Sequence, residues 1–187
     1  MTTLWMWAET ALTGAFYVAA MVFLILRLAG VYDFAWLISA RDFSAAAGIV
    51  AVGLSYVAGR LAAVLQDPLL RLVRITSANA GAISDQDHIR IWQHGSQRLH
   101  WGIDTTFYIS ELSKSLSVAT LTFAVCFALW LYEALSPFAA LAMIAFGVMC
   151  FVCFVRAFLQ QQALLEQYLR AAIVEIDLEV AHSRMKD

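Results

Sequence analysis

The chain has 187 residues, of which 62% are hydrophobic and 14% are charged, and its mean hydropathy is +0.74. A soluble domain carries roughly 25% charged residues, so this composition excludes the soluble class and indicates an integral membrane protein. The formal net charge of −2 and the dispersed Lys and Arg residues give no reason to expect nucleic acid as a partner.

Four apolar runs are long enough to cross about 30 Å of hydrocarbon at 1.5 Å per residue. They are predicted near residues 11–29, 44–64, 116–134 and 138–158. The residues before the first run carry no cation, so we expect a retained span and not a cleaved signal. The chain is thus predicted to be an all-α integral membrane protein with four transmembrane helices in two hairpins.

Basic residues are distributed unequally between the two sides of these runs. The loop 30–43 holds only Arg41 and the loop 135–137 holds no cation, whereas ten of the twelve basic residues fall on the opposite side. By the positive-inside rule, both termini and the central segment are predicted to be cytoplasmic, in a bacterial-type inner membrane. The expected organisation is a first hairpin (1–65), a cytoplasmic helical segment (66–114), a second hairpin (115–158) and a long cytoplasmic tail helix (159–187), within one structural domain.

The central segment is predicted to contain two short helices. Asp67 and Pro68 are typical of an N-cap and a first helical position, so a helix along the inner headgroup layer is expected to begin there. A capping-box pattern at Ser84 predicts a second helix, which runs to about Trp101 before Gly102 breaks it. A further helix is then expected to continue unbroken into the third span.

The second of these short helices is predicted to have one basic and aromatic face, because residues on a helix are 100° apart. Two interpretations fit: a site for an anionic lipid headgroup, a nucleotide or an acidic partner helix, and an ordinary solvated stripe. The opposite face, with Trp92 and Leu99, is expected to be packed. The predicted partner- or anion-binding residues are Arg90, His94, Arg98 and Trp101.

The histidines and cysteines do not form a motif for a metal or for catalysis. His88, His94 and His100 are six residues apart, which rotates successive rings by about 120°, so no metal site is expected. Cys150 and Cys153 have Cys-x-x-Cys spacing, but the sequence lacks the second pair that quinone-linked disulfide-forming membrane proteins need, which favours a packing role. No catalytic or cofactor-binding motif is present, so an enzyme is not expected.

Two spans carry stripes of small residues, which let helix backbones approach closely. In the second span, the predicted packing ridge consists of Ser44, Gly48, Ala51, Ser55 and Gly59. In the third span, hydroxyl side chains over the cytoplasmic half have two interpretations: the lining of a narrow aqueous path, and interhelical packing with the hydroxyls bonded back to the helix. These hydroxyls belong to Ser110, Ser113, Ser117 and Thr120.

Two further pairings are expected from residue position. Arg27 and Glu133 fall at the same external depth on different spans, which predicts an ion pair between the hairpins; a ring of Glu133 around an outer pore mouth is the alternative. In the tail, apolar residues repeat at 4-3-4 spacing, which predicts a seam against a neighbouring subunit of a homo-oligomer. The seam residues are Leu165, Leu169, Ala172 and Ile176.

In outline, two externally connected hairpins with a central cytoplasmic segment and a helical tail resemble three groups of proteins. These are four-helix pore-forming channels, the membrane subunit of flagellar-motor stators, and small membrane subunits of bacterial defence systems such as Kiwa. The resemblance is one of topology and transfers no residue role. Two functions are expected as alternatives: a non-enzymatic homo-oligomeric anchor that senses or signals to a soluble cytoplasmic partner, as in an antiviral defence-type system, and a homo-oligomeric ion channel or pore. No cofactor is expected for either function.

Overall fold

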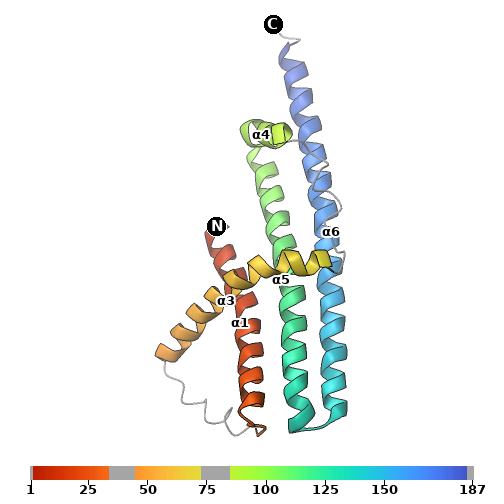
Figure 1. Ribbon diagram of the computed structural model, residues 1–187. Helices are drawn as coiled ribbons and strands as arrows, with labels where there is room; N and C mark the ends of the chain where they lie inside the picture. The colour runs from red at the N-terminus through yellow and green to blue at the C-terminus, as the bar shows by residue number, and fades with distance from the viewer. Residues whose placement is uncertain (1, 34–44, 73–84, 185–187) are drawn as a thin grey trace. The chain divides into compact units, whose positions relative to one another are not determined.

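The structure, a computed structural model, describes residues 2–33, 45–72 and 85–184. The regular elements in these residues are all α-helices (Figure 1): α1 (Thr2–Leu28), α3 (Ala45–Leu72), α4 (Asp85–His94), α5 (Gln97–Ala134) and α6 (Pro137–Arg184). Within this described part, three stretches have the length and hydropathy of a membrane span: Trp7–Leu28, Leu99–Ala134 and Pro137–Leu178. The chain is therefore a helical membrane protein. The predicted second span corresponds to a shorter apolar stretch in α3, Gly48–Val64.

The helix boundaries around Pro68 differ from the prediction. A new helix does not begin at Asp67 and Pro68, because α3 continues through Pro68 to Leu72. Proline removes one backbone N–H and so one hydrogen bond to the carbonyl four residues earlier. In a helix of 28 residues with good helix formers on both sides, the loss of one bond does not end the helix.

The helix break predicted at Gly102 lies instead at Gly95 and Ser96, between α4 and α5. The Gly95 amide donates to the Ile91 carbonyl over 2.8 Å and closes α4. The Ser96 carbonyl accepts hydrogen bonds from the amides three and four residues later, which starts α5. Gly102 lies inside α5, where a single glycine costs only about 1 kcal/mol relative to alanine and is tolerated in a long helix.

The fourth apolar run and the predicted tail helix form one unbroken helix. α6 extends over 48 residues from Pro137 to Arg184. Ser136 begins this helix: its hydroxyl accepts from the Ala139 amide and its carbonyl accepts from the Ala140 amide, both over 3.2 Å. The connection from α5 is therefore a tight turn, as the short 135–137 loop predicts.

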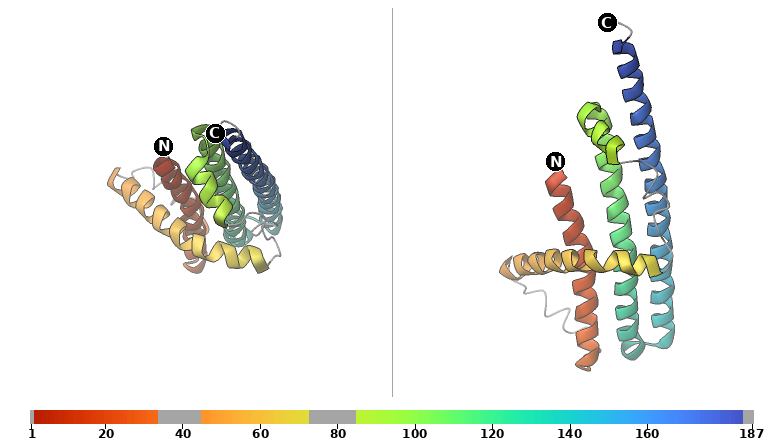
Figure 2. Two further views of the ribbon diagram at one scale, coloured as in Figure 1. Left: turned by 90° about the horizontal axis from the view of Figure 1, so that it is seen from above. Right: turned by 45° about the horizontal axis from the view of Figure 1, so that its top comes forward.

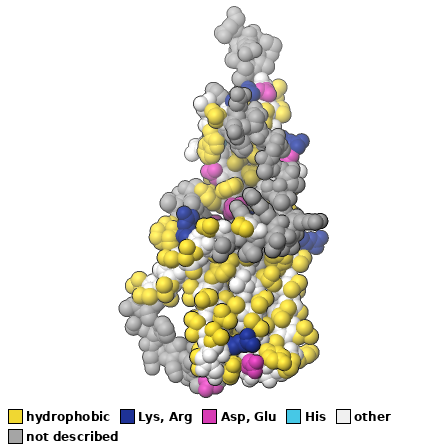
Figure 3. Space-filling model, in the orientation of Figure 1, with side chains coloured by type: hydrophobic (Ala, Val, Ile, Leu, Met, Phe, Trp, Pro, Cys, Tyr) yellow, Lys and Arg dark blue, Asp and Glu magenta, His cyan; other side chains and the backbone are white. Residues whose placement is uncertain are grey.

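The chain forms two compact units, and unit 1 comprises residues 1–74 and 112–155. In unit 1, part of α5 lies between α1 and part of α6, and both ribbon figures show α3 crossing α1 obliquely (Figures 1 and 2). The core of unit 1 joins Ala128 and Trp130 of α5 to Ala140 of α6, with Phe23 and Leu26 of α1 packed against them. Its outer surface is largely apolar (Figure 3), as a surface in contact with lipid requires.

Unit 2 comprises residues 75–111 and 156–187. Here α4 packs against α5 and α6 through Ile91, which is buried together with Ala172 and Ile176 of α6. Leu99 and Ile103 of α5 complete this small core. Tertiary contacts on the Ile91 side of α4 therefore hold this helix against α5 and α6.

Candidate functional site

The predicted partner-binding residues lie on both sides of the α4–α5 break, so they do not share one continuous helix face. Arg90 belongs to α4 and Trp101 to α5, while the side chains of His94 and Arg98 lie outside the described part of the structure. The prediction of a single face is wrong because Gly95 and Ser96 end one helix and start the next.

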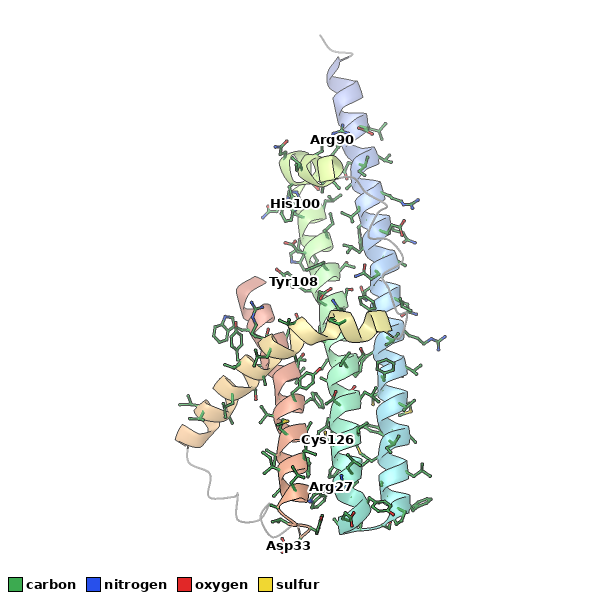
Figure 4. The ribbon with its side chains drawn as sticks, viewed as in Figure 1. Arg27, Asp33, Arg90, His100, Tyr108 and Cys126 are labelled. Carbon is green, nitrogen blue, oxygen red and sulfur yellow. The ribbon has the colours of Figure 1, made fainter. Side chains whose placement is uncertain are left out.

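Arg90 makes a specific contact within unit 2. Its Nη2 donates to Asp177 Oδ1 of α6 over 2.9 Å, and Figure 4 shows Arg90 at the side of α4 that faces α6. Both side chains are about half exposed, so this ion pair contributes at most about 1 kcal/mol to stability. The contact nevertheless engages the Arg90 charge with a carboxylate of the same chain.

The bend between α4 and α5, which we call the elbow (residues 89–101), is held by a histidine. His100 Nε2 lies 2.8 Å from the Ile91 carbonyl oxygen, and it donates a hydrogen bond in the tautomer that carries the proton on Nε2. The His100 ring also stacks on Trp92, with ring centroids 4.9 Å apart. Gly95 is required for this approach, because a Cβ there would lie 2.5 Å from the Ile91 oxygen and 2.9 Å from His100 Nε2.

Two tryptophans on the elbow are exposed. Trp92 is 58% exposed and Trp101 is 68% exposed, and Ile89 on α4 is exposed as well. The prediction that Trp92 packs is wrong, because the helix break turns Ile91 toward the core in its place. The Gly95–Ser96 dipeptide is the sequence signal that marks this break, since Ser-Gly type pairs favour loops.

The predicted small-residue ridge on α3 contacts α1 over part of its length. A Cβ on Gly59 would overlap the Thr10 carbonyl oxygen, and a Cβ on Gly14 would overlap that of Ser55. Next to this crossing, the Trp7 and Tyr56 rings stack with centroids 4.2 Å apart. Close backbone contact here depends on the absence of side chains at the two glycines.

The other half of the ridge does not form this contact. Gly48 and Ala51 are exposed, and Gly48 has no atom within 4 Å of its Cβ position, while Ser44 lies outside the described residues. This half makes no close contact in the described chain because α3 crosses α1 at an angle and diverges from it (Figure 2), so here the ridge stays a prediction. Thr13, near the crossing, is 2% exposed, and its Oγ1 is a buried side-chain atom without a hydrogen-bond partner in the described chain.

The predicted hydroxyl stripe of α5 faces the interior of the protein. Ser117 donates to the Lys114 carbonyl and Thr120 to the Leu116 carbonyl, each over 2.7 Å, which is the back-bonded arrangement of the packing interpretation. Ser110 is fully buried and accepts from Gln162 Nε2 of α6 over 2.7 Å. Ser113 is also buried. Farther along the same stripe, Ala124 meets Gly147 of α6, where a Cβ on the glycine would overlap the alanine methyl.

The structure brings Arg27 and Glu133 together at one end of unit 1. Arg27 Nη2 lies 4.0 Å from Glu133 Oε1, the outer limit of an ion pair, and both side chains are partly exposed. Figure 4 shows Arg27 and Asp33 at this same end. In the described chain, the pair links α1 to α5, as expected from their common depth.

The predicted oligomer seam on α6 is occupied within the chain. Ala172 and Ile176 are buried against Ile91 of α4, and Leu169 packs against the same cluster. Leu165 is partly buried. Within the described chain, α4 folds back and covers part of this apolar stripe, and the assignment of the seam to a neighbouring subunit stays a prediction.

The remaining chemistry-bearing residues do not assemble into a site in the described part of the chain. Cys126, Cys150 and Cys153 are free thiols, and the described residues contain no group of three His, Cys, Asp or Glu side chains placed to hold a metal ion. Comparison with protein families, curated proteins and solved structures finds no match to this chain. The class that the fold itself defines is a helical membrane protein, and its most distinctive exposed surface is the elbow.

Proposed function

We propose that this protein is a non-enzymatic membrane anchor whose unit 2 recruits a soluble partner on the cytoplasmic side of a bacterial-type inner membrane. The observation that carries the proposal is the elbow, where Trp92 and Trp101 are exposed on a unit with its own small core. Large exposed aromatic side chains are enriched at protein interfaces. Membership of an antiviral defence-type system stays a prediction from topology.

Helix length supports a location of unit 2 outside the hydrocarbon. At 1.5 Å per residue, α5 with 38 residues and α6 with 48 residues are about 57 Å and 72 Å long. About 30 Å of each suffices to cross the hydrocarbon. The length beyond 30 Å is assigned to the parts of α5 and α6 that belong to unit 2. Those parts hold charged residues, namely Glu111, Arg156, Glu166 and Arg170.

Chain connectivity supports four crossings in two hairpins. Trp130 Nε1, near the end of α5, donates to the Val31 carbonyl just after α1, so these two ends lie on one side of the bilayer. Because α5 crosses the bilayer and begins at Gln97 on the other side, the chain has to return between Asp33 and Gln97. Among the residues described in that interval, α3 is the long apolar helix, and at about 42 Å it is long enough to cross while tilted. The positive-inside rule then favours cytoplasmic termini.

The alternative function, a pore, finds less support. Three of the four hydroxyls expected to line it, those of Ser110, Ser117 and Thr120, are bonded to carbonyls of their own helix or to Gln162. The α6 seam expected to join subunits is covered by α4. A single chain therefore suffices for the anchor function, which does not need a homo-oligomer.

The test is site-specific photo-crosslinking in native membranes. A photoreactive amino acid in place of Trp101 is expected to link the protein to a soluble protein, whereas the same group in place of Phe146, an exposed residue of unit 1, is expected to link only to lipid or membrane proteins. Cross-links of both positions to membrane components alone would contradict an anchor. Unitary currents from the purified protein in planar bilayers would favour the pore.

Topology is tested by labelling single cysteines in a variant that lacks the three native thiols. Cysteines in place of Asp33 and Ser136 are expected to react with an impermeant reagent from outside the cell. A cysteine in place of Leu178 is expected to react only after the membrane is opened. Reaction of Leu178→Cys from outside would reverse the proposed orientation.

A further inference from the structure

Aromatic side chains and one carboxylate at the elbow and on the following turns of α5 indicate the class of partner. We infer that Trp92, Trp101, Asp104 and Tyr108 form a docking surface, the elbow surface, for an amphipathic helix of the partner whose apolar face is bordered by Lys or Arg. This inference rests on the proposed function, because it names the partner that unit 2 recruits.

The three α5 residues of the elbow surface share one side of that helix. Leu99 and Ile103 of α5 point into the core formed with α6. At 100° per residue, Trp101 and Tyr108 lie roughly opposite to them, with Asp104 between these two aromatic residues along the same side. Trp101, Asp104 and Tyr108 follow i, i+3 and i+7 spacing, which spans two helical turns, or about 10 Å.

The elbow surface has exposed apolar side chains, and because unit 2 is proposed to lie outside the hydrocarbon, their partner is a protein and not lipid. Trp101 is the most exposed tryptophan among the described side chains, and Trp92 and Ile89 lie exposed on the adjacent helix. Single exposed apolar residues are ordinary, but several large ones together mark interaction sites. Amphipathic helices bind such surfaces with apolar anchors at i, i+3 or i+4, and i+7.

The charge around the elbow surface favours a basic rim on the partner. Arg90 and Arg170 of unit 2 are each paired with a carboxylate of α6, Asp177 and Glu166 respectively. In the part of the chain that the structure describes, Asp104 has no such ion pair. A Lys or Arg placed over the Trp101 ring and beside the Asp104 carboxylate would gain both a cation–π contact and an ionic contact.

Two aromatic side chains of the elbow surface, Trp92 and Tyr108, have ring contacts within unit 2. The His100 hydrogen bond to the Ile91 carbonyl fixes the bend, and the stacked Trp92 ring lies on His100. Tyr108 contacts Phe107 edge to face, with centroids 5.9 Å apart. Trp92 and Tyr108 therefore lose less side-chain freedom on binding, which favours affinity.

The test uses the full-length protein in nanodiscs of phosphatidylcholine, which is zwitterionic and does not itself attract charged peptides. The probes are two synthetic amphipathic helices with the same leucine face, one bordered by lysine and the other by glutamate. The lysine peptide is expected to bind and the glutamate peptide to bind at least about tenfold more weakly. Trp101→Ala and Asp104→Lys are each expected to weaken binding of the lysine peptide about tenfold or more.

Matched variants on α6 control for general effects of charge and apolar area. Leu178→Ala and Glu175→Lys change exposed residues of unit 2 outside the elbow surface and are expected to leave lysine-peptide binding unchanged. Preference for the glutamate peptide, or equal losses from the α6 variants, overturns the inferred surface. If the Trp101 photo-crosslink to a soluble protein persists in that case, the anchor function still holds and only the inferred partner class fails. The photo-crosslink thus distinguishes failure of the elbow surface from failure of the anchor function.

Discussion

Trp130 of α5 is fully buried, and its indole Nε1 donates a 2.7 Å hydrogen bond to the carbonyl oxygen of Val31. The turn after α1 presents this carbonyl: Gly30, at φ 70°, lets the Val31 amide bond back to the Leu26 carbonyl over 2.9 Å. The Trp130 ring also packs against Phe23 of α1, with centroids 5.5 Å apart. One side chain therefore fixes where α1 ends relative to α5.

Trp130→Phe is expected to lower stability by about 1–3 kcal/mol, because it leaves the Val31 carbonyl without this donor and reduces the buried ring. Thermal melting in detergent measures the loss. Tyr132→Phe, at an exposed aromatic position two residues away, is the control and is expected to melt like the parent protein. Equal melting of Trp130→Phe and the parent would show that the hydrogen bond contributes nothing.

Gly59→Ala is expected to weaken the α1–α3 crossing, since its methyl group has to displace the Thr10 backbone. Overpacking at a close contact costs roughly 1–3 kcal/mol. Gly53→Ala is the matched control on the same helix, where the Cβ position is open and alanine is a better helix former. A lower melting temperature for Gly53→Ala than for Gly59→Ala contradicts the crossing.

Gly147→Ala is expected to separate α5 from α6, because the new methyl group overlaps that of Ala124. The next nearest atoms are Ala124 Cα at 3.7 Å and the Thr120 carbonyl oxygen at 3.9 Å, which are ordinary contacts. Ala124→Gly in the same chain should therefore restore most of the lost melting temperature. Additive losses in the double variant would show that the two helices do not meet at this pair.

Thr13→Val is expected to be neutral or stabilising, since it replaces a buried hydroxyl without a partner by a methyl group of similar shape. Thr106→Val is the control, because the Thr106 hydroxyl donates to the Gly102 carbonyl over 2.8 Å and its loss is not compensated. Detergent melting compares the two. A large loss for Thr13→Val alone would reveal a partner for its hydroxyl.

Ala172→Leu is expected to displace α4, because Ala172 is fully buried against the Ile91 cluster and has no space for a larger side chain. Faster amide hydrogen exchange in α4 measures the displacement. Ala171→Leu, at the adjacent exposed position, is the control and should leave exchange unchanged. Unchanged exchange in both variants, with a change in oligomer size for Ala172→Leu, would return the stripe to a subunit interface.

The sequence by itself determined that the protein is a helical membrane protein, because long apolar runs have few stable arrangements outside a bilayer. It also located the unbroken helix into the tail, since no Pro or Gly pattern ends α6 before Arg184. The pairing of Arg27 with Glu133 was expected because their positions along two predicted spans place them at the same depth in the membrane. Each of these depends on composition or on distance along a single helix.

Only the tertiary structure decided which stripes meet which helices. The same apolar spacing at Ala172 and Ile176 fits a neighbouring subunit or another helix of the chain, and α4 provides the latter. Ser55 and Gly59 contact α1 while Gly48 does not, because the crossing angle between two helices is set by packing and not by either sequence alone. The exposure of Trp92 followed from a helix break at Gly95 and Ser96, which local hydrogen bonds and the His100 contact stabilise.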